Sequence, residues 1–391
     1  MDGLWAHHHG EWRDPAQVVS QWRQAAEVDS RLLQYRVRGE WWSTLAAAEL
    51  TLLITREYEH LVIAMSASER GRPAVTYHPL PHPSGLVADR VRGLVYIAST
   101  RNPNQIYELA PVRQVPRADK RPDSTDDRPL IPVRSRFLPG FLYLHDLELI
   151  GDVLHGNAVG MNAVVRLDES GGASPVWWPR SIETRSGPCF ERNHLQLNSI
   201  AAGPDLQTSY FSASTPTMSR RRPGHLNFPV DRRGVIFSGA TREPIVEGLT
   251  RPHSARLRDG VIWVDNSGYG ELGRVVDGTF EPVVRLPGWT RGLSFAGDIA
   301  FVGTSRVIPR FHRYAPGLDQ ARSECGIHAI DVRSGKILGA ITWPLGNQIF
   351  AIDWLPTTVA SGLAFRHGRS ASTRARLFFA FEPVPPRASS A

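Results

Sequence analysis

The fold is decided by the stretch HSARL-RDG-VIWV, residues 253–264. It predicts a strand, a tight turn around Asp259-Gly260 and a returning strand, because two runs of high β-propensity flank a turn dipeptide. The same pattern recurs along the chain. Copies begin at residues 84, 145, 198, 253, 291 and 348, the copy at 198 being looser and the one at 348 degraded.

Six copies indicate a six-bladed β-propeller, an all-β fold. Their mean spacing is about 53 residues, longer than the ~40–45 of compact WD-type blades but suited to four-stranded blades with insertions. No long helical period intervenes, and 34 glycines and 30 prolines supply many turns. Radial closure of the blades removes most unpaired sheet edges, which explains why repeated short strands favour this architecture.

The chain outside the repeat divides into three parts. Residues 1–50 are predicted to form an N-terminal α-helical cap, because apolar residues recur at helical spacing between Pro15 and Arg36. The propeller takes residues 51–385. Within it, the polar and proline-rich segment 111–136 is expected to be an exposed insertion, and 386–391 a frayed tail.

Several motifs are similar to those of an uncharacterised bacterial family of conserved hypothetical propeller proteins. They are RPHSARL (251–257) with IWVDNSG (262–268), PGWTRGLS (287–294), NHLQLN (193–198) and CGIHAID (325–331). The resemblance covers roughly residues 50–360 and implies the propeller fold. It implies little about activity. At the level of fold alone, the repeat also resembles lactonase-like and lyase-like six-bladed propellers.

Composition excludes several classes of protein. Two cysteines among 391 residues cannot build a disulfide framework, and no CxxC pair offers a thiolate zinc site. The sequence has no glycine-rich phosphate loop and no GxSxG elbow, so no nucleotide cofactor is expected. The net charge of +7 is spread along the chain, which argues against nucleic acid as a partner. No membrane span or signal peptide is recognisable, so a soluble, cytoplasmic protein is expected, with a homodimer through the N-terminal helices as one option.

Aligning the copies places one polar residue per blade at the central axis. The innermost strands line a propeller's channel, so equivalent positions converge. The predicted ring consists of Ser84, His145, Asn198, His253, Arg291 and Gln348. A position that served only packing would be small or apolar in most copies. The ring therefore predicts a functional centre.

Two chemistries are open for this ring. Imidazoles of His82, His145, His194 and His253 suit a divalent metal ion of unknown identity, with Glu148 or Asp146 as a further ligand or partner. Without a metal, His145 and His253 serve as general acid and base while Arg291 holds an anionic group. Ser84, Asn198, Gln348 and Glu148 are then expected to bind substrate. Histidines that merely hydrogen-bond inside a polar channel are the structural alternative.

These residues predict an enzyme of a biosynthetic pathway. Proton transfer of the lyase, epimerase (isomerase) or cyclase type on an anionic small molecule or peptide fits better than hydrolysis, because no activated nucleophile is evident. The alternative is a non-catalytic propeller module that binds a peptide or protein partner. Such a module would carry an aromatic patch on a rim and a channel plugged by apolar side chains.

Overall fold

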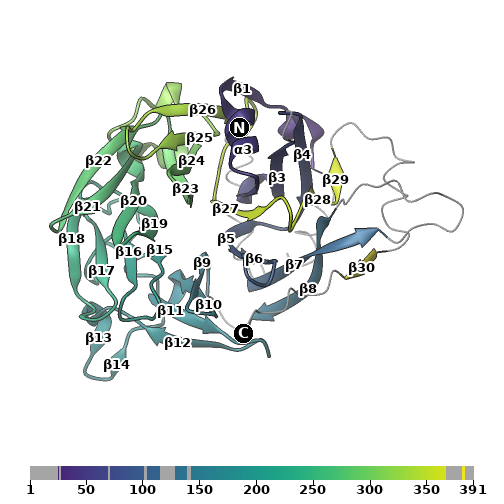
Figure 1. Ribbon diagram of the computed structural model, residues 1–391. Coiled ribbons are helices and arrows are strands. Elements are labelled where there is room, and N and C mark those ends of the chain that lie inside the picture. The colour runs from purple at the N-terminus through teal and green to yellow at the C-terminus, as the bar shows by residue number, and fades with distance from the viewer. Residues whose placement is uncertain are drawn as a thin grey trace, which may run out of the picture.

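The computed structural model describes residues 25, 28–68, 71–100, 104–114, 128–138, 142–366 and 381–383. Six antiparallel sheets stand around a central axis (Figure 1). The predicted six-bladed β-propeller is confirmed. No helix in the described part of the chain is long and apolar enough to cross a membrane.

Three blades follow the chain from the inner strand outward. They are β9 (Leu144–Ile150), β10 (Val153–Ala158), β11 (Ala163–Leu167) and β12 (Ala173–Trp177); β15 (Leu197–Ala201), β16 (Tyr210–Ala213), β17 (Gly234–Ser238) and β18 (Pro244–Leu249); and β19 (Pro252–Arg258), β20 (Val261–Asn266), β21 (Glu271–Val276) and β22 (Thr279–Arg285). A small hairpin of β13 (Glu183–Thr184) and β14 (Gly187–Pro188) lies outside the blades.

The other three blades gain strands from distant parts of the chain. They are β5 (Pro83–Asp89), β6 (Leu94–Ser99), β7 (Asn104–Gln114) and β8 (Pro129–Leu138) with β28 (Gly362–Leu363) and β30 (Phe381–Pro383); β23 (Trp289–Ala296), β24 (Ile299–Ser305), β25 (Gly326–Asp331) and β26 (Ile337–Thr342) with β1 (Arg36–Gly39); and β27 (Ala351–Pro356), β2 (Leu50–Arg56), β3 (Leu61–Ala67) and β4 (Pro73–Pro79) with β29 (Phe365–Arg366).

The ring is closed by strands from opposite ends of the sequence. The inner strand β27 pairs along its whole length with β2, from Leu50 opposite Pro356 to Thr55 opposite Ala351. On the other side of the same junction, β1 pairs with β26. The sixth repeat copy is therefore the inner strand of a blade whose outer strands come from the N-terminal side. Unfolding either end exposes sheet edges, so closure couples the two ends energetically.

The predicted helical cap is only partly present. Residues 15–24, 26 and 27 of the segment Pro15–Arg36 lie outside the described residues, and dimerisation through this segment stays a prediction. Within 28–50 the structure has a 3-10 turn η1 (Ser30–Leu33), strand β1 and a single short helix, α3 (Trp41–Ala47). Residues 36–39 are a strand because the free edge of β26 offers them hydrogen bonds. A cap spanning 1–50 is thus not what the described residues form.

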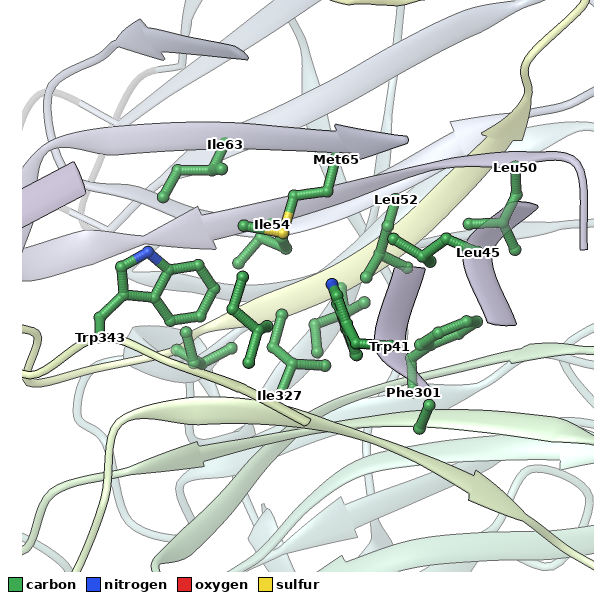
Figure 2. Close-up of a cluster of buried hydrophobic side chains, with 14 of the residues drawn as sticks. Trp41, Leu45, Leu50, Leu52, Ile54, Ile63, Met65, Phe301, Ile327 and Trp343 are labelled. Atoms are coloured by element: carbon green, nitrogen blue, oxygen red, sulfur yellow. The ribbon is translucent and has the colours of Figure 1, made fainter. Parts of the chain in front are cut away.

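The helix α3 is part of the propeller core. Trp41 is fully buried and its ring meets Phe301 edge-on, with centroids 6.0 Å apart. Figure 2 shows Trp41 and Leu45 among side chains of the closing blades, including Ile54, Ile327 and Trp343. Burying two indoles and many aliphatic groups here supplies a large hydrophobic contribution to ring closure.

The predicted boundaries of the insertion at 111–136 are wrong. Residues 111–114 and 129–136 belong to the paired strands β7 and β8, with Pro111 opposite Leu130. Proline is compatible with a strand where its missing N–H is not needed for the hydrogen-bond ladder. Proline content alone therefore predicted a longer insertion than the structure has. Residues 115–127 lie outside the described residues.

Side chains tie every pair of neighbouring inner strands. Around the ring the bonds are Ser84 Oγ to Leu144 O (3.1 Å), Ile200 N to Asp146 Oδ2 (3.0 Å), Ala255 N to Ser199 Oγ (2.8 Å), Gly292 N to Ser254 Oγ (2.7 Å), Ser294 Oγ to Asp353 Oδ1 (3.0 Å) and Ala88 N to Asp353 Oδ2 (2.8 Å). Inner strands of adjacent blades share no continuous ladder, so these side chains satisfy backbone groups that face the channel. Much of the polarity of the inner strands is therefore structural.

Candidate functional site

The inner strands are irregular at their first residues. Pairing with the second strand shifts between Pro83 and Leu86, around His145 in β9, after Leu197, after His253 and after Thr290. Such bulges re-aim side chains and recur beside functional sites. Five of the six predicted ring residues therefore lie at or beside bulges, where strand alternation no longer fixes their direction, and Gln348 lies in the loop before β27.

A cavity of about 1310 Å³ opens at this end of the channel. Its floor comes from the starts of β9, β19 and β23 and from the short 3-10 turn η2 (Glu57–Glu59). Its walls come from residues 191–196 and 222–226 and from η6 (Pro309–Tyr314). Among the described residues, the lining carries six arginines against two glutamates: Arg192, Arg222, Arg251, Arg291, Arg306 and Arg313 against Glu57 and Glu191. The cavity thus has a strongly cationic lining.

Four predicted ring residues line this cavity: His145, His253, Arg291 and Gln348. Burial lowers the pKa of His253. The charges of Arg291, Arg251 and His145 lower it further, so these groups lie close together. Gln348 reaches the cavity from the loop before β27 rather than from the strand itself. The alignment of the degraded copy was therefore out of register although the residue lies at the site.

Ser84 and Asn198 do not line the cavity. The Ser84 hydroxyl donates to the carbonyl oxygens of Ala98 and Leu144. The Asn198 amide donates to Pro252 O at 2.8 Å and to Ser214 Oγ at 3.1 Å. Both side chains tie strands together, so their predicted role in substrate binding is wrong in this structure.

Glu148 lies farther along the channel in a buried ionic network. Arg256 reaches Glu148 Oε1 at 3.0 Å and Asp146 Oδ2 at 2.9 Å. Burial raises the pKa of Glu148 to about 8, and the neighbouring Asp146 and Asp353 act in the same direction against Arg256. Glu148 is outside the cavity lining, so its predicted contact with substrate is also wrong.

The four histidines predicted as metal ligands do not converge. His82 packs against His60 with ring centroids 4.3 Å apart, and His194 follows the lining residue Asn193 without lining the cavity itself. Among the residues that the structure describes, no group of three or more His, Cys, Asp or Glu side chains is placed to hold a metal ion. The predicted four-histidine set is therefore wrong as a metal centre. A metal held by His145 and His253 with other groups stays an untested prediction.

The hydrogen bonds of His253 show which of its two ring nitrogens carries the proton. Its Nδ1 lies 2.8 Å from Arg251 O and 3.0 Å from Ser267 Oγ, and that hydroxyl donates to Thr290 O. A carbonyl oxygen only accepts, so Nδ1 carries the hydrogen and Nε2 keeps the lone pair. Burial and nearby arginines hold the pKa of His253 well below 6.5. At neutral pH this residue is thus a neutral imidazole with a basic Nε2.

The two arginines beside His253 lack carboxylate partners. The guanidinium carbon of Arg291 lies 3.3 Å from the centre of the Phe350 ring, and that of Arg251 lies 4.3 Å from the Tyr314 ring. Neither forms an ion pair with a described carboxylate within 4 Å, although Glu57 acts on Arg291 at longer range. Burial lowers the pKa of both, that of Arg251 to about 10.

Sequence reasoning missed a second set of lining residues. Tyr143, Gln196, Arg251 and Trp289 each stand two positions before a ring residue, and all line the cavity. The first three have φ between +51° and +54°. Non-glycine residues in this left-handed region are uncommon and cluster at binding sites. The i−2 spacing repeats in the sequence and was available as a signal, whereas Glu57 and Tyr58 precede the first copy and had none.

Comparisons with solved structures identify the fold alone. A chain of a nidogen–laminin complex has a TM-score of 0.51 at 9% identity, with 78% of this chain and 98% of that chain covered. A streptogramin B lyase (TM-score 0.36, 14% identity, 74% and 75% covered) and a Bacteroides uniformis protein provisionally assigned as a 6-phosphogluconolactonase (0.40, 14%, 74% and 80%) are also similar. No curated protein matches the sequence.

A comparison with models of protein families agrees with the motifs found in the sequence. The match spans the six-bladed part of the chain, from β1 through the closing strands, and includes every lining residue of the cavity. The predicted membership of an uncharacterised propeller family is confirmed. Since residues 39–363 match the domain of unknown function DUF4915, the chain belongs to that family.

Proposed function

We propose that this protein is an enzyme that moves a proton on a carbon atom of an anionic small molecule or peptide bound in the cavity. The observation that carries the proposal is His253: a neutral imidazole with Nδ1–H fixed by Arg251 O, placed among His145 and two arginines without carboxylate partners. A cationic cavity attracts anions. A base that stays unprotonated at neutral pH suits proton abstraction.

The first step uses His253 as the base. Its Nε2 takes a proton from a carbon next to the substrate's carboxyl or carbonyl group, and the C–H bond breaks. The electron pair moves onto that group, whose oxygen gains negative charge. Arg291 stabilises this oxygen, because a guanidinium in a partly dehydrated site interacts strongly with developing charge.

The second step uses His145. In its protonated form it returns a proton to the carbon on the other face, which gives epimerisation. Alternatively it protonates a leaving group on the adjacent carbon as the electron pair forms a double bond, which gives elimination. Tyr143 packs beside His145, with ring centroids 4.9 Å apart, and Phe350 meets it edge-on at 5.6 Å. These aromatic contacts orient the imidazole.

The test is hydrogen exchange in D₂O. The protein is incubated with a panel of hydroxy acids, amino acids, short peptides and sugar acids, and loss of C–H signals is followed by ¹H NMR. Exchange that depends on His253 supports the proposal. If compounds bind but none exchanges, or if His253→Gln exchanges as fast as the parent protein, the enzyme proposal fails and the predicted binding module takes its place.

A further inference from the structure

We infer that the cavity recognises a molecule with two anionic groups, one held by Arg251 and the other by Arg291, on either side of His253. This inference rests on the proposed function and deepens it by naming the substrate class. The two groups can be carboxylates or phosphates, since a guanidinium fork recognises both. Four observations support it.

Arg291 presents its donors to the cavity. Its guanidinium carbon lies 3.3 Å from the centre of the Phe350 ring, and among the described residues no atom accepts a hydrogen bond from its guanidinium. A stacked guanidinium keeps its N–H edge free for a planar, bidentate acceptor. Glu57 lies across the cavity floor at longer range.

Arg251 is more deeply buried and only partly satisfied. It is 5% exposed, and its Nη1 donates to Gln196 Oε1 at 2.5 Å and Ser214 Oγ at 3.1 Å. Its Nε has no hydrogen-bond partner in the described structure. Neutral acceptors fix one end of the fork, and no described carboxylate balances the charge. A buried cation left in this state is costly unless an anion joins it.

Two other arginines inside the propeller have carboxylate partners. Arg256, three residues farther along the same strand as His253, is held by Asp146 and Glu148. Arg56 lies 3.3 Å from Glu59 and is fully buried. Arg136, in contrast, is buried and donates to the backbone oxygen of Asp168 without a described carboxylate partner. Arg251 and Arg291 also lack such a partner, and unlike Arg136 they line the cavity.

Topology places the two arginines around the proposed base. Arg251 leads directly into β19 two residues before His253, and Arg291 is the third residue of β23, the adjacent inner strand. Each lowers the pKa of His253, and each acts on the other, so the three groups are close neighbours. A molecule bridging both arginines holds its intervening carbon atoms against His253. The remaining wall of Trp289, Phe311 and Tyr314 suits a larger apolar part of the same molecule.

The test compares dianions with monoanions of equal length. Calorimetry measures succinate, glutarate and adipate against butyrate, valerate and hexanoate in the intact protein. We expect at least one dicarboxylate to bind about tenfold or more tightly than its partner, which corresponds to ~1.4 kcal/mol. Arg291→Gln and Arg251→Gln should each remove that advantage. Arg233→Gln, at an exposed arginine outside the cavity lining, is the matched control and should preserve it.

The controls separate folding from recognition. Arg251 is buried, so its variant is also checked by near-UV circular dichroism, and Arg251→Lys keeps the charge while losing the fork. Equal affinities for dianions and monoanions, no binding by any dicarboxylate, or a preserved advantage in the folded Arg291→Gln variant would overturn the inference. Deuterium exchange on a monoanion that depends on His253 would then leave the proposed function standing without the second anionic group.

Discussion

The Nδ1 atom of His253 lies 2.8 Å from the carbonyl oxygen of Arg251, and this contact joins the proposed base to one of the two arginines beside it. The two residues are separated only by Pro252. The left-handed φ of +54° at Arg251 turns the chain as it approaches the strand, and His253 follows at a bulge. Backbone geometry alone therefore sets the tautomer of the imidazole.

Replacing His253 tests its role as the base. His253→Gln keeps a polar side chain of similar reach but cannot take up a proton at neutral pH. We expect the deuterium-exchange rate to fall by about 10²-fold or more while binding of the same compound changes little. His155→Gln, at a histidine of β10 outside the cavity lining, should leave the rate unchanged. A His253→Gln rate near that of the parent protein contradicts the assignment.

The pH profile gives a second measurement on His253. Burial and the cationic neighbours lower its pKa well below 6.5, and the neutral form is the active base. Protonation of His253 should therefore not change the exchange rate between pH 8 and 6.5. The rate should begin to fall only below pH 6.5, where His253 becomes protonated. A loss centred on pH 6.5 would mean that the catalytic imidazole is exposed and unperturbed.

Removing Arg256 tests whether the ionic network in the channel is structural. Arg256→Met leaves the Asp146 carboxylate buried without its cation, so the free energy of unfolding should fall by about 3–5 kcal/mol. Arg274→Met removes a half-exposed partner of Glu281 and should change it by less than about 1 kcal/mol. Urea unfolding measures both. A small effect at Arg256 would show that the network contributes little to stability.

Glu148 should make stability depend on pH. Its pKa rises from 4.5 in the unfolded chain to about 8 in the folded protein, because burial disfavours its charge. Between these values the folded state binds the extra proton, so stability falls as pH rises, by up to about 1.4 kcal/mol per pH unit. Glu148→Gln removes this term.

The check is the difference between the parent protein and Glu148→Gln in urea unfolding at pH 5, 6, 7 and 8. The variant should gain relative stability steadily across that range. Glu281→Gln serves as the exposed control and should show no trend. A difference that is constant with pH would mean that Glu148 keeps an ordinary pKa beside Arg256.

The repeat predicted the fold because strand–turn–strand units are local. Residues 253–264 specify a hairpin through the turn at Asp259-Gly260, and the same local signal recurs in the other blades. The strand pairing that closes the ring could not be predicted from such local signals. The pairing of β27 with β2 joins residues about 300 positions apart, and no local pattern encodes that contact.

The site was predicted less completely because its residues lie at bulges and in loops. At a bulge the alternation of a strand is lost, so Ser84 and His145 share a repeat position but point to different surroundings. His82 stands two residues before Ser84, which is the repeat position that Arg251 takes before His253. Its ring nevertheless packs on His60, the residue that follows η2. Glu57 is the first residue of η2, where no repeat copy had been recognised. Side-chain direction at these positions depends on neighbouring blades, which a single repeat unit does not contain.

The two tryptophans of α3 provide a matched pair for testing the closure of the ring. Trp41 is fully buried against Phe301 in the cluster of Figure 2, whereas its neighbour Trp42 is half-buried and contacts Tyr35 at 6.0 Å. Trp41→Ala should lower the free energy of unfolding by about 3–5 kcal/mol, because it leaves a large cavity between the closing blades. Trp42→Ala changes the helix propensity by the same amount, but the space that it leaves is open to solvent. The free energy of unfolding should therefore fall clearly less than in Trp41→Ala. Urea unfolding compares the two. Equal effects would indicate that α3 contributes through its helix alone, and that the closing blades hold together without Trp41.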